Sequence, residues 1–155
     1  MRIRPASEAD TDTVRDLFRE YAASLGIDLE FQGFERELAD LPGCYGQPQG
    51  VVLLAFLDEV PAGCVALRPL AEGYCEMKRL YLRPLARGTG LGRALAEQII
   101  AEAKKRAYTA MRLDTLDSMD SAIGLYESLG FERVPAYYEN PIPGTLYFEQ
   151  KLDAR

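Results

Sequence analysis

The feature that most constrains this chain is a glycine-rich turn at residues 83–93, with the sequence RPLARGTGLGR. An apolar run before it predicts a strand, and an amphipathic pattern after it predicts a helix. The glycines at positions 88, 90 and 92 let the backbone approach a ligand closely, because they have no Cβ. Backbone N–H groups at a helix start carry partial positive charge, and Arg87 and Arg93 add two cations. The turn therefore predicts a site for a phosphate group.

Composition indicates a globular chain whose net charge does not favour nucleic acid as a partner. Of the 155 residues, 48% are hydrophobic and 27% are charged, so we expect residues 1–155 to form a single domain. No apolar run approaches the roughly 20 residues of a membrane span, and the N-terminus lacks a signal-peptide pattern. The expected location is the cytoplasm, away from any membrane. The net charge of −6 argues against nucleic acid as a partner.

The absence of histidine removes several kinds of chemistry at once. It excludes Ser-His-Asp and Cys-His catalysis, histidine-ligated zinc and a histidine general base. Cys44, Cys64 and Cys75 are isolated and form no CxxC spacing, which is typical of a reducing compartment. We therefore expect no metal site and no covalent nucleophile.

Hydrophobic periodicity predicts strands and helices along the whole chain. Strands are expected at residues 2–5, 51–57, 60–67, 74–82, 110–116, 131–134 and 145–152, and helices at residues 7–26, 31–41, 91–106 and 118–130. The run at residues 51–57 is apolar throughout, which indicates a central strand covered on both faces. Asp117 or Ser118 is expected to cap the last helix. The order strand–helix–helix–strand–strand–strand–helix–strand–helix–strand–strand implies an α/β fold with a mixed sheet and helices on both faces.

Two common phosphate-binding motifs do not fit the turn. The Walker A pattern GxxxxGK followed by Ser or Thr is absent from the chain. The dinucleotide pattern GxGxxG would begin at Gly88, but Arg93 stands where its third glycine belongs. The chain also does not place this motif in a first strand–helix unit at the N-terminus with an acidic residue about 20 residues further on.

A third pattern matches: Arg or Gln, two residues, Gly, one residue, then Gly or Ala, here at residues 87–92. It resembles the acyl-coenzyme A site of the GNAT family of N-acetyltransferases. The family's second signature, LYxxxGF, stands at residues 125–131, one helix and one strand further on. The resemblance spans essentially the whole chain. It implies the GNAT fold, with a mostly antiparallel sheet, and direct transfer of acetyl from acetyl-coenzyme A to a primary amine.

The resemblance also implies the residues that hold the cofactor. Backbone N–H groups of the turn contact the pyrophosphate, and the strand before it pairs with the pantetheine arm. The implied residues are Leu80, Leu82, Arg87, Gly88, Thr89, Gly90, Leu91, Gly92, Arg93 and Met119. Many relatives carry an asparagine where this chain has Met119, so that amide contact is lost here, and Ser118 or Asp117 are the candidates to replace it.

Two catalytic residues are implied in the same way. A tyrosine at the position of Tyr126 protonates the coenzyme thiolate in many relatives, so Tyr126 is the candidate general acid. Glu76 is the candidate base, because histone-modifying relatives use a glutamate at that place. Two other interpretations stay open: Tyr126 as a core residue only, and Glu76 paired with Lys78 or a cross-strand cation while a water chain carries the proton.

Strand alternation assigns side chains of residues 74–82 to two faces. One face is expected to carry Glu76, Lys78 and Leu80, and the other Met77, Arg79 and Tyr81. By resemblance, a strand N–H near Leu80 stabilises the oxyanion that forms on the thioester.

The acceptor is expected between the first two helices and the loop before the last strand. The candidate contact residues are Phe31, Lys78, Arg79, Tyr138 and Asn140. Lys78 or Arg79 suits an acceptor with a carboxylate, so a small, amino-acid-like amine is favoured. Open alternatives are a protein acceptor and a non-catalytic module that senses acyl-coenzyme A. A homodimer would pair through an exposed edge such as residues 145–152.

Overall fold

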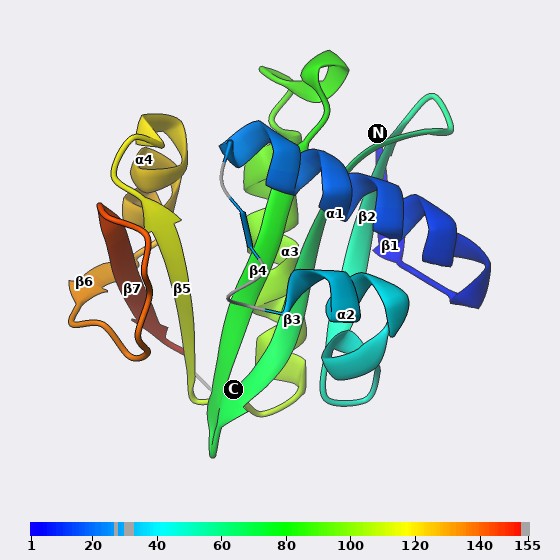
Figure 1. Ribbon diagram of the computed structural model, residues 1–155. Helices are drawn as coiled ribbons and strands as arrows, with labels where there is room; N and C mark the ends of the chain where they lie inside the picture. Colours follow the sequence, from blue (N-terminus) through cyan, green and yellow to red (C-terminus); the bar gives the residue numbers. More distant parts are fainter. Residues whose placement is uncertain (27, 30–32, 153–155) are drawn as a thin grey trace.

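The computed structural model describes residues 1–26, 28–29 and 33–152. One seven-stranded sheet, in the order β1-β2-β3-β4-β5-β7-β6, lies between helices on its two faces (Figure 1). The strands are β1 (Arg2–Pro5), β2 (Val51–Leu57), β3 (Val60–Ala71), β4 (Tyr74–Leu82), β5 (Ala110–Leu116), β6 (Glu132–Val134) and β7 (Thr145–Lys151). The helices are α1 (Thr11–Leu25), α2 (Phe34–Ala39), α3 (Leu91–Lys105) and α4 (Asp120–Ser128), with 3-10 turns η1 (Glu8–Asp10), η3 (Gly43–Tyr45) and η4 (Pro84–Ala86). The expected element order and the mixed α/β fold are confirmed.

The core consists of two layers that share the central strands. Leu17 and Phe18 of α1 are fully buried against one face of the sheet, and Leu95 and Ile99 of α3 are fully buried against the other. Adjacent residues of β2 divide between the layers, Leu53 facing α3 and Leu54 facing α1. The apolar run of β2 is therefore a strand buried on both faces, as its composition predicts.

The pairing of β4 with β5 is short, and this determines where a ligand can enter. The two strands are parallel neighbours only at Tyr74–Glu76 opposite Ala110–Arg112. Beyond these pairs β4 continues to Leu82 and β5 to Leu116 without pairing to each other. The backbone of β4 that faces β5 is thus left without a strand partner over its second half.

A β-bulge in β4 overturns the alternation expected for this strand. The register with β3 shifts between Cys64 and Ala66, and Arg79 adopts a left-handed φ of 62°. One extra residue in a strand turns the following side chains to the opposite face. Leu80 therefore packs in the α3 layer with Met77, whereas Arg79 bonds to α2 on the other side. The predicted grouping of Leu80 with Lys78, and of Arg79 with Met77, is wrong for this reason.

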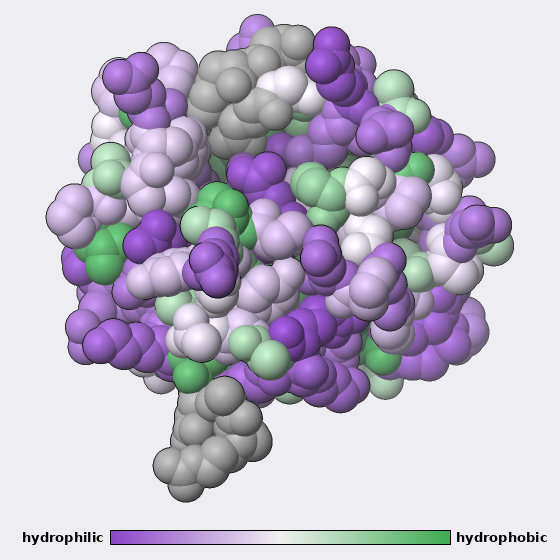
Figure 2. Space-filling view, turned by 90° about the horizontal axis from the view of Figure 1, so that it is seen from below, coloured by the Kyte–Doolittle hydropathy of each residue, from purple (hydrophilic) through white to green (hydrophobic). Residues whose placement is uncertain are grey.

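The last strand is not an edge of the sheet. β7 pairs with β5 along its whole length and with the short β6 on its other side. The prediction that β7 is the exposed edge is therefore wrong, because β6 pairs with residues 147–149 on its outer side. A homodimer stays a prediction. The face shown in Figure 2 is mainly hydrophilic, with hydrophobic residues scattered over it. No helix of the described residues is long and apolar enough to cross a bilayer.

Candidate functional site

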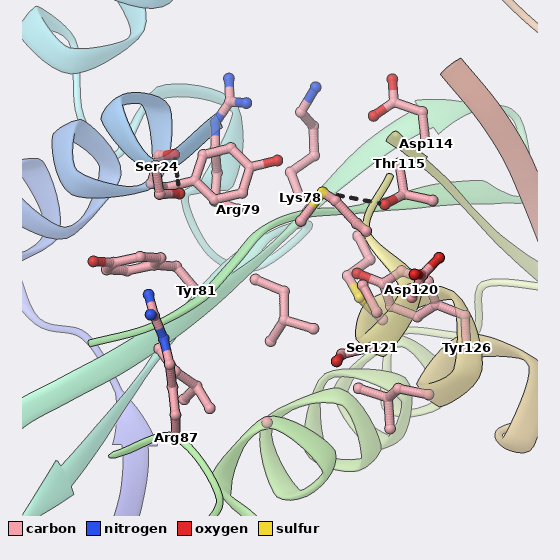
Figure 3. Close-up of a pocket in the computed structure, with 18 of the residues that line it drawn as sticks. Ser24, Lys78, Arg79, Tyr81, Arg87, Asp114, Thr115, Asp120, Ser121 and Tyr126 are labelled. Carbon is pink, nitrogen blue, oxygen red and sulfur yellow. Dashed lines mark hydrogen bonds between the residues drawn. The ribbon is translucent and has the colours of Figure 1, made fainter. Parts of the chain in front are cut away.

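A cleft of about 710 Å³ occupies the gap where β4 and β5 separate. Arg87 of the glycine turn lies at one end, Tyr126 and Ser121 of α4 line a second side, and Ser24 of α1 lies on a third (Figure 3). Elements far apart in sequence therefore enclose one space.

The glycine turn has the geometry of an anion site. Gly88 and Gly90 have left-handed φ angles of 78° and 88°, and no atom lies within 4 Å of the place where a Cβ would stand. Gly90 is the N-cap of α3, and the Thr89 hydroxyl accepts a hydrogen bond from the Leu91 N–H at 3.3 Å. The next N–H groups belong to the first helical turn, which leaves them without intrahelical acceptors. Open space, free donors and a helix N-terminus together fit a phosphate.

The cleft brings together six of the ten residues implied in cofactor binding. Its lining includes Leu80, Leu82, Arg87, Gly88, Gly92 and Met119. Thr89 and Gly90 belong to the turn but do not line the cleft, and the Leu91 side chain is buried in the core. The Arg93 side chain turns away instead, bonding to Ser128 of α4 at 2.9 Å and to Glu97 at 3.4 Å. Arg93 thus ties α3 to α4.

Tyr126, the predicted general acid, is a buried residue that borders the cleft. Its side chain lines the cleft, is only 7% exposed, and packs edge-on against Phe131 with ring centroids 5.9 Å apart. The LYxxxGF motif builds this contact, since Gly130 ends α4 with a φ of 98° and the Phe131 N–H bonds back to the Tyr126 carbonyl at 3.0 Å. Burial raises the pKa of the Tyr126 hydroxyl well above its usual value, so the phenol keeps its proton at neutral pH.

Glu76 lies behind the cleft. Its side chain is 1% exposed and does not line the cleft; it borders a neighbouring pocket of about 250 Å³. Arg68, its cross-strand partner on β3, bonds one carboxylate oxygen at 2.7 Å, and the Tyr137 hydroxyl donates to the other at 2.6 Å. Both oxygens are therefore engaged, which is the cross-strand pairing that the sequence left open.

The residues expected to contact the acceptor lie in different surroundings. Arg79 is 2% exposed, donates to both oxygens of Glu37 at 3.0 and 2.9 Å, and stands over the rings of Tyr21 and Phe34. Lys78 borders both the cleft and the neighbouring pocket, and burial lowers the pKa of its ammonium. Arg79 therefore joins α2 to the sheet. Lys78 instead faces the boundary between the cleft and the neighbouring pocket.

The other acceptor candidates belong to the loop before β7. Tyr138 donates a hydrogen bond to Asp114, and Asn140 donates to the Tyr138 oxygen at 2.8 Å. Tyr138 borders the neighbouring pocket. Phe31 lies outside the described residues.

Met119 lies at the start of α4, and the cap expected there is different. Met119 itself is the N-cap and its side chain makes no capping hydrogen bond to the helix, so neither Asp117 nor Ser118 caps the helix as predicted. The Met119 sulfur accepts a bond from the Thr115 hydroxyl at 3.6 Å (Figure 3). Ser118 lines the cleft, whereas Asp117 does not.

Sequence reasoning did not single out Asp114, although its carboxylate lines the cleft. In β5 the polar residues Arg112 and Asp114 alternate with buried Leu113. Arg112 is paired with Glu149 at 2.7 Å, and Asp114 is the next residue of that face, past the last β4–β5 pair. The alternation of polar and buried residues in β5 can be read from the sequence. The point at which β5 stops pairing with β4 cannot.

A split sheet with a glycine-rich helix terminus at the split is the arrangement that the resemblance to the GNAT family implies. The sequence profile of the Acetyltransferase (GNAT) family matches residues 12–131. The chain therefore belongs to the GNAT family of acetyltransferases.

Relatives and solved structures agree with this assignment. An uncharacterised N-acetyltransferase of Schizosaccharomyces pombe is 43% identical over 145 residues, which cover 92% of this chain and 89% of the relative. The crystal structure of a putative acyl-CoA N-acyltransferase of Klebsiella pneumoniae has a TM-score of 0.78 at 26% identity and covers 98% of this chain and 97% of its own. A putative acetyltransferase of Salmonella typhimurium, solved with its cofactor acetyl-CoA, has the same fold, with a TM-score of 0.71 at 22% identity over 99% of this chain and 94% of its own.

Proposed function

We propose that residues 1–155 act as one acetyl-coenzyme A-dependent N-acetyltransferase domain that transfers acetyl directly to the primary amine of a small metabolite. The observation that carries the proposal is the split between β4 and β5, which opens a cleft with the glycine turn at its end. The free backbone of β4 offers strand-like hydrogen bonds to an extended amide-bearing arm. The turn offers N–H donors to its pyrophosphate.

The chain's residues divide the work of the reaction. An alkylammonium has no lone pair and a pKa of about 8–10, so the acceptor must lose a proton before it attacks. A β4 N–H near Leu80, in the unpaired half of the strand, stabilises the charge that develops on the thioester oxygen. The Tyr126 hydroxyl donates a proton to the departing thiolate, since its raised pKa keeps that proton available at neutral pH.

The acceptor is proposed to be small and amino-acid-like. The space beside the cleft is a pocket of about 250 Å³ bordered by Glu37, Arg68, Lys78 and the Tyr137–Tyr138 pair. Its charged and hydroxyl groups suit a compact polar molecule better than an extended peptide. Lys78 joins this pocket to the cleft, and its ammonium suits an acceptor carboxylate. In this proposal Arg79 acts indirectly, by holding α2 through Glu37.

Thiol release from acetyl-coenzyme A, measured with a panel of amino acids, polyamines and aminoglycosides, tests the proposal. Turnover that depends on one of these amines is the expected result. Tight coenzyme binding with no turnover on any amine or on peptides would indicate the sensing module instead. If the folded protein neither bound the coenzyme nor released thiol, both the acetyltransferase and the sensing module would be contradicted.

A further inference from the structure

Asp114 and Lys78 stand at equivalent positions on the two sides of the split. Glu76 and Arg112 form the last β4–β5 pair, and each of these two residues is two positions further along its strand. Residues two apart in a strand share a face. Figure 3 shows both side chains projecting toward the same side of the cleft, and both line it. The Asp114 charge favours the charged form of Lys78 across this gap.

A chain of hydrogen bonds fixes one oxygen of Asp114. Asn140 accepts the Ile142 N–H at 2.8 Å and donates to the Tyr138 oxygen at 2.8 Å. Because this oxygen already accepts, the Tyr138 hydroxyl directs its own proton to Oδ2 of Asp114. The chain therefore holds Asp114 as an acceptor, and Oδ1 takes no part in it.

Hydroxyl groups from several elements interact with Asp114, as does the Lys78 ammonium across the gap. The Asp114 charge acts on Tyr21 of α1, Tyr126 of α4, Tyr147 of β7, and Tyr137 and Tyr138 of the preceding loop. The pKa of each of these phenols is raised, first by burial, and that of Tyr21 reaches about 12. They stay neutral at physiological pH. Asp114 is thus a carboxylate surrounded by neutral hydroxyls and facing Lys78.

Glu76 is less suited to meet an amine in the cleft. Arg68 and Tyr137 engage its two oxygens, and it does not line the cleft. Asp114 does line it and is half-buried, so a substrate cation can reach it.

We propose that Asp114 binds the ammonium group of the acceptor and receives its proton, an inference that rests on the proposed function. One ammonium proton passes to Oδ1 of Asp114, and the nitrogen lone pair then forms a bond to the thioester carbonyl carbon. As the carbon–sulfur bond breaks, the thiolate takes the proton of the Tyr126 hydroxyl. The nitrogen still carries two protons and gives one of them, through solvent, to the deprotonated Tyr126, which leaves the neutral amide. Asp114 returns its own proton to solvent. The acceptor is therefore a cationic primary amine, which Asp114 selects by charge.

Asp114→Asn tests this role, with Asp12→Asn at the exposed start of α1 as the matched control outside the cleft. With the amine that the wild type uses best, kcat/KM at pH 7 is expected to fall about 100-fold in Asp114→Asn. The loss should shrink as pH rises toward the pKa of the amine, because free amine needs no protein base. Coenzyme Kd should stay within about threefold of wild type, and Asp12→Asn should match wild type throughout.

Tyr138→Phe provides a second variant that keeps the carboxylate. Loss of a hydrogen bond to the ionised carboxylate should raise the acidic pKa of the kcat/KM profile and lower kcat/KM at pH 7 by about 3–10-fold. An Asp114→Asn enzyme within threefold of wild type at pH 7, a loss that is equal at every pH, or an unchanged profile in Tyr138→Phe overturns the inference. A wild type without turnover on any amine would instead remove the proposed function itself.

Discussion

At the scale of single residues, the packing role of the Tyr126 ring can be tested separately from the proposed proton donation by its hydroxyl. The ring packs against Phe131 and Phe148, while the side chain reaches the cleft. Tyr126→Phe keeps the packing and removes the proton donor, so kcat should fall by about 10–100-fold. Coenzyme Kd, measured by calorimetry, should stay within about threefold. Tyr108→Phe is the control, since its hydroxyl bonds to the Gln49 carbonyl away from the cleft. Unchanged turnover in Tyr126→Phe would leave Tyr126 as a core residue only.

A second residue-scale prediction concerns Asp10, which anchors β1 to the start of α1. Its carboxylate accepts hydrogen bonds from Arg4 at 2.7 and 3.1 Å and from the Ser7 N–H at 2.8 Å. The Arg4 hydrogen bond, followed by the Ser7 N–H, holds the pKa of Asp10 well below its usual range. A depressed pKa contributes stability above the unfolded-state value of about 4 and loses it as pH falls.

Asp10→Asn should therefore lower the free energy of unfolding at pH 7 by about 1–3 kcal/mol. The difference from wild type should begin to narrow when the pH falls to 3, because the unfolded state binds a proton there that Asp10 of the folded state does not yet bind. Urea denaturation at the two pH values measures both. Asp12→Asn is the matched control, because Asp12 is 96% exposed and its pair with Arg15 is screened by solvent. An equal difference at both pH values would contradict the linkage.

At the scale of elements, two glycines of the turn between β4 and α3 allow fold stability and coenzyme binding to be tested separately. Gly90 has a left-handed φ of 88°, so Gly90→Ala should destabilise the fold by about 1–2 kcal/mol. Gly92 lies inside the first turn of α3, and an added Cβ would meet only Leu82 Cδ1, at 3.4 Å. Gly92→Ala should keep or slightly raise stability because alanine favours the helix. It should nevertheless weaken coenzyme binding by about tenfold or more, by placing a methyl group at the phosphate donors.

Thermal unfolding and calorimetry on the two variants distinguish these effects. If Gly92→Ala bound the coenzyme as tightly as wild type, the turn would not be in contact with the pyrophosphate. If Gly90→Ala were fully stable, the left-handed conformation at that position would not be required.

The elements also show which features the sequence can predict. Strand and helix positions follow from local periodicity, and the glycine spacing and LYxxxGF motif mark the two ends of the cleft. The bulge at Arg79 was not predictable, because a register shift against β3 has no local signature in an apolar strand. Asp114 was missed for a related reason. Its role depends on where β4 stops pairing with β5, and residues far apart in sequence decide that.

At the scale of the whole molecule, the cleft between β4 and β5 divides the sheet into two parts. β4 and the strands before it carry α1 and α2, while β5, β6 and β7 continue the sheet beyond the split. Three pairs of residues connect the two parts through β4 and β5. Side-chain bonds add to them, including that from Tyr137 to Glu76, which joins the loop before β7 to β4. A ligand in the cleft touches both parts and should therefore stabilise the fold as a unit.

Acetyl-coenzyme A at 100 times its Kd should add about 2.7 kcal/mol to the free energy of unfolding. For a chain of this size, that gain corresponds to a rise in Tm of about 5–11 °C. Pantetheine and adenosine diphosphate each resemble only one end of the coenzyme, so either alone at the same concentration should raise Tm less. Gly92→Ala should lose part of the shift with the coenzyme but not with pantetheine, because only the former places phosphates at the turn. An equal response of that variant to both ligands would mean that the pyrophosphate lies elsewhere in the cleft.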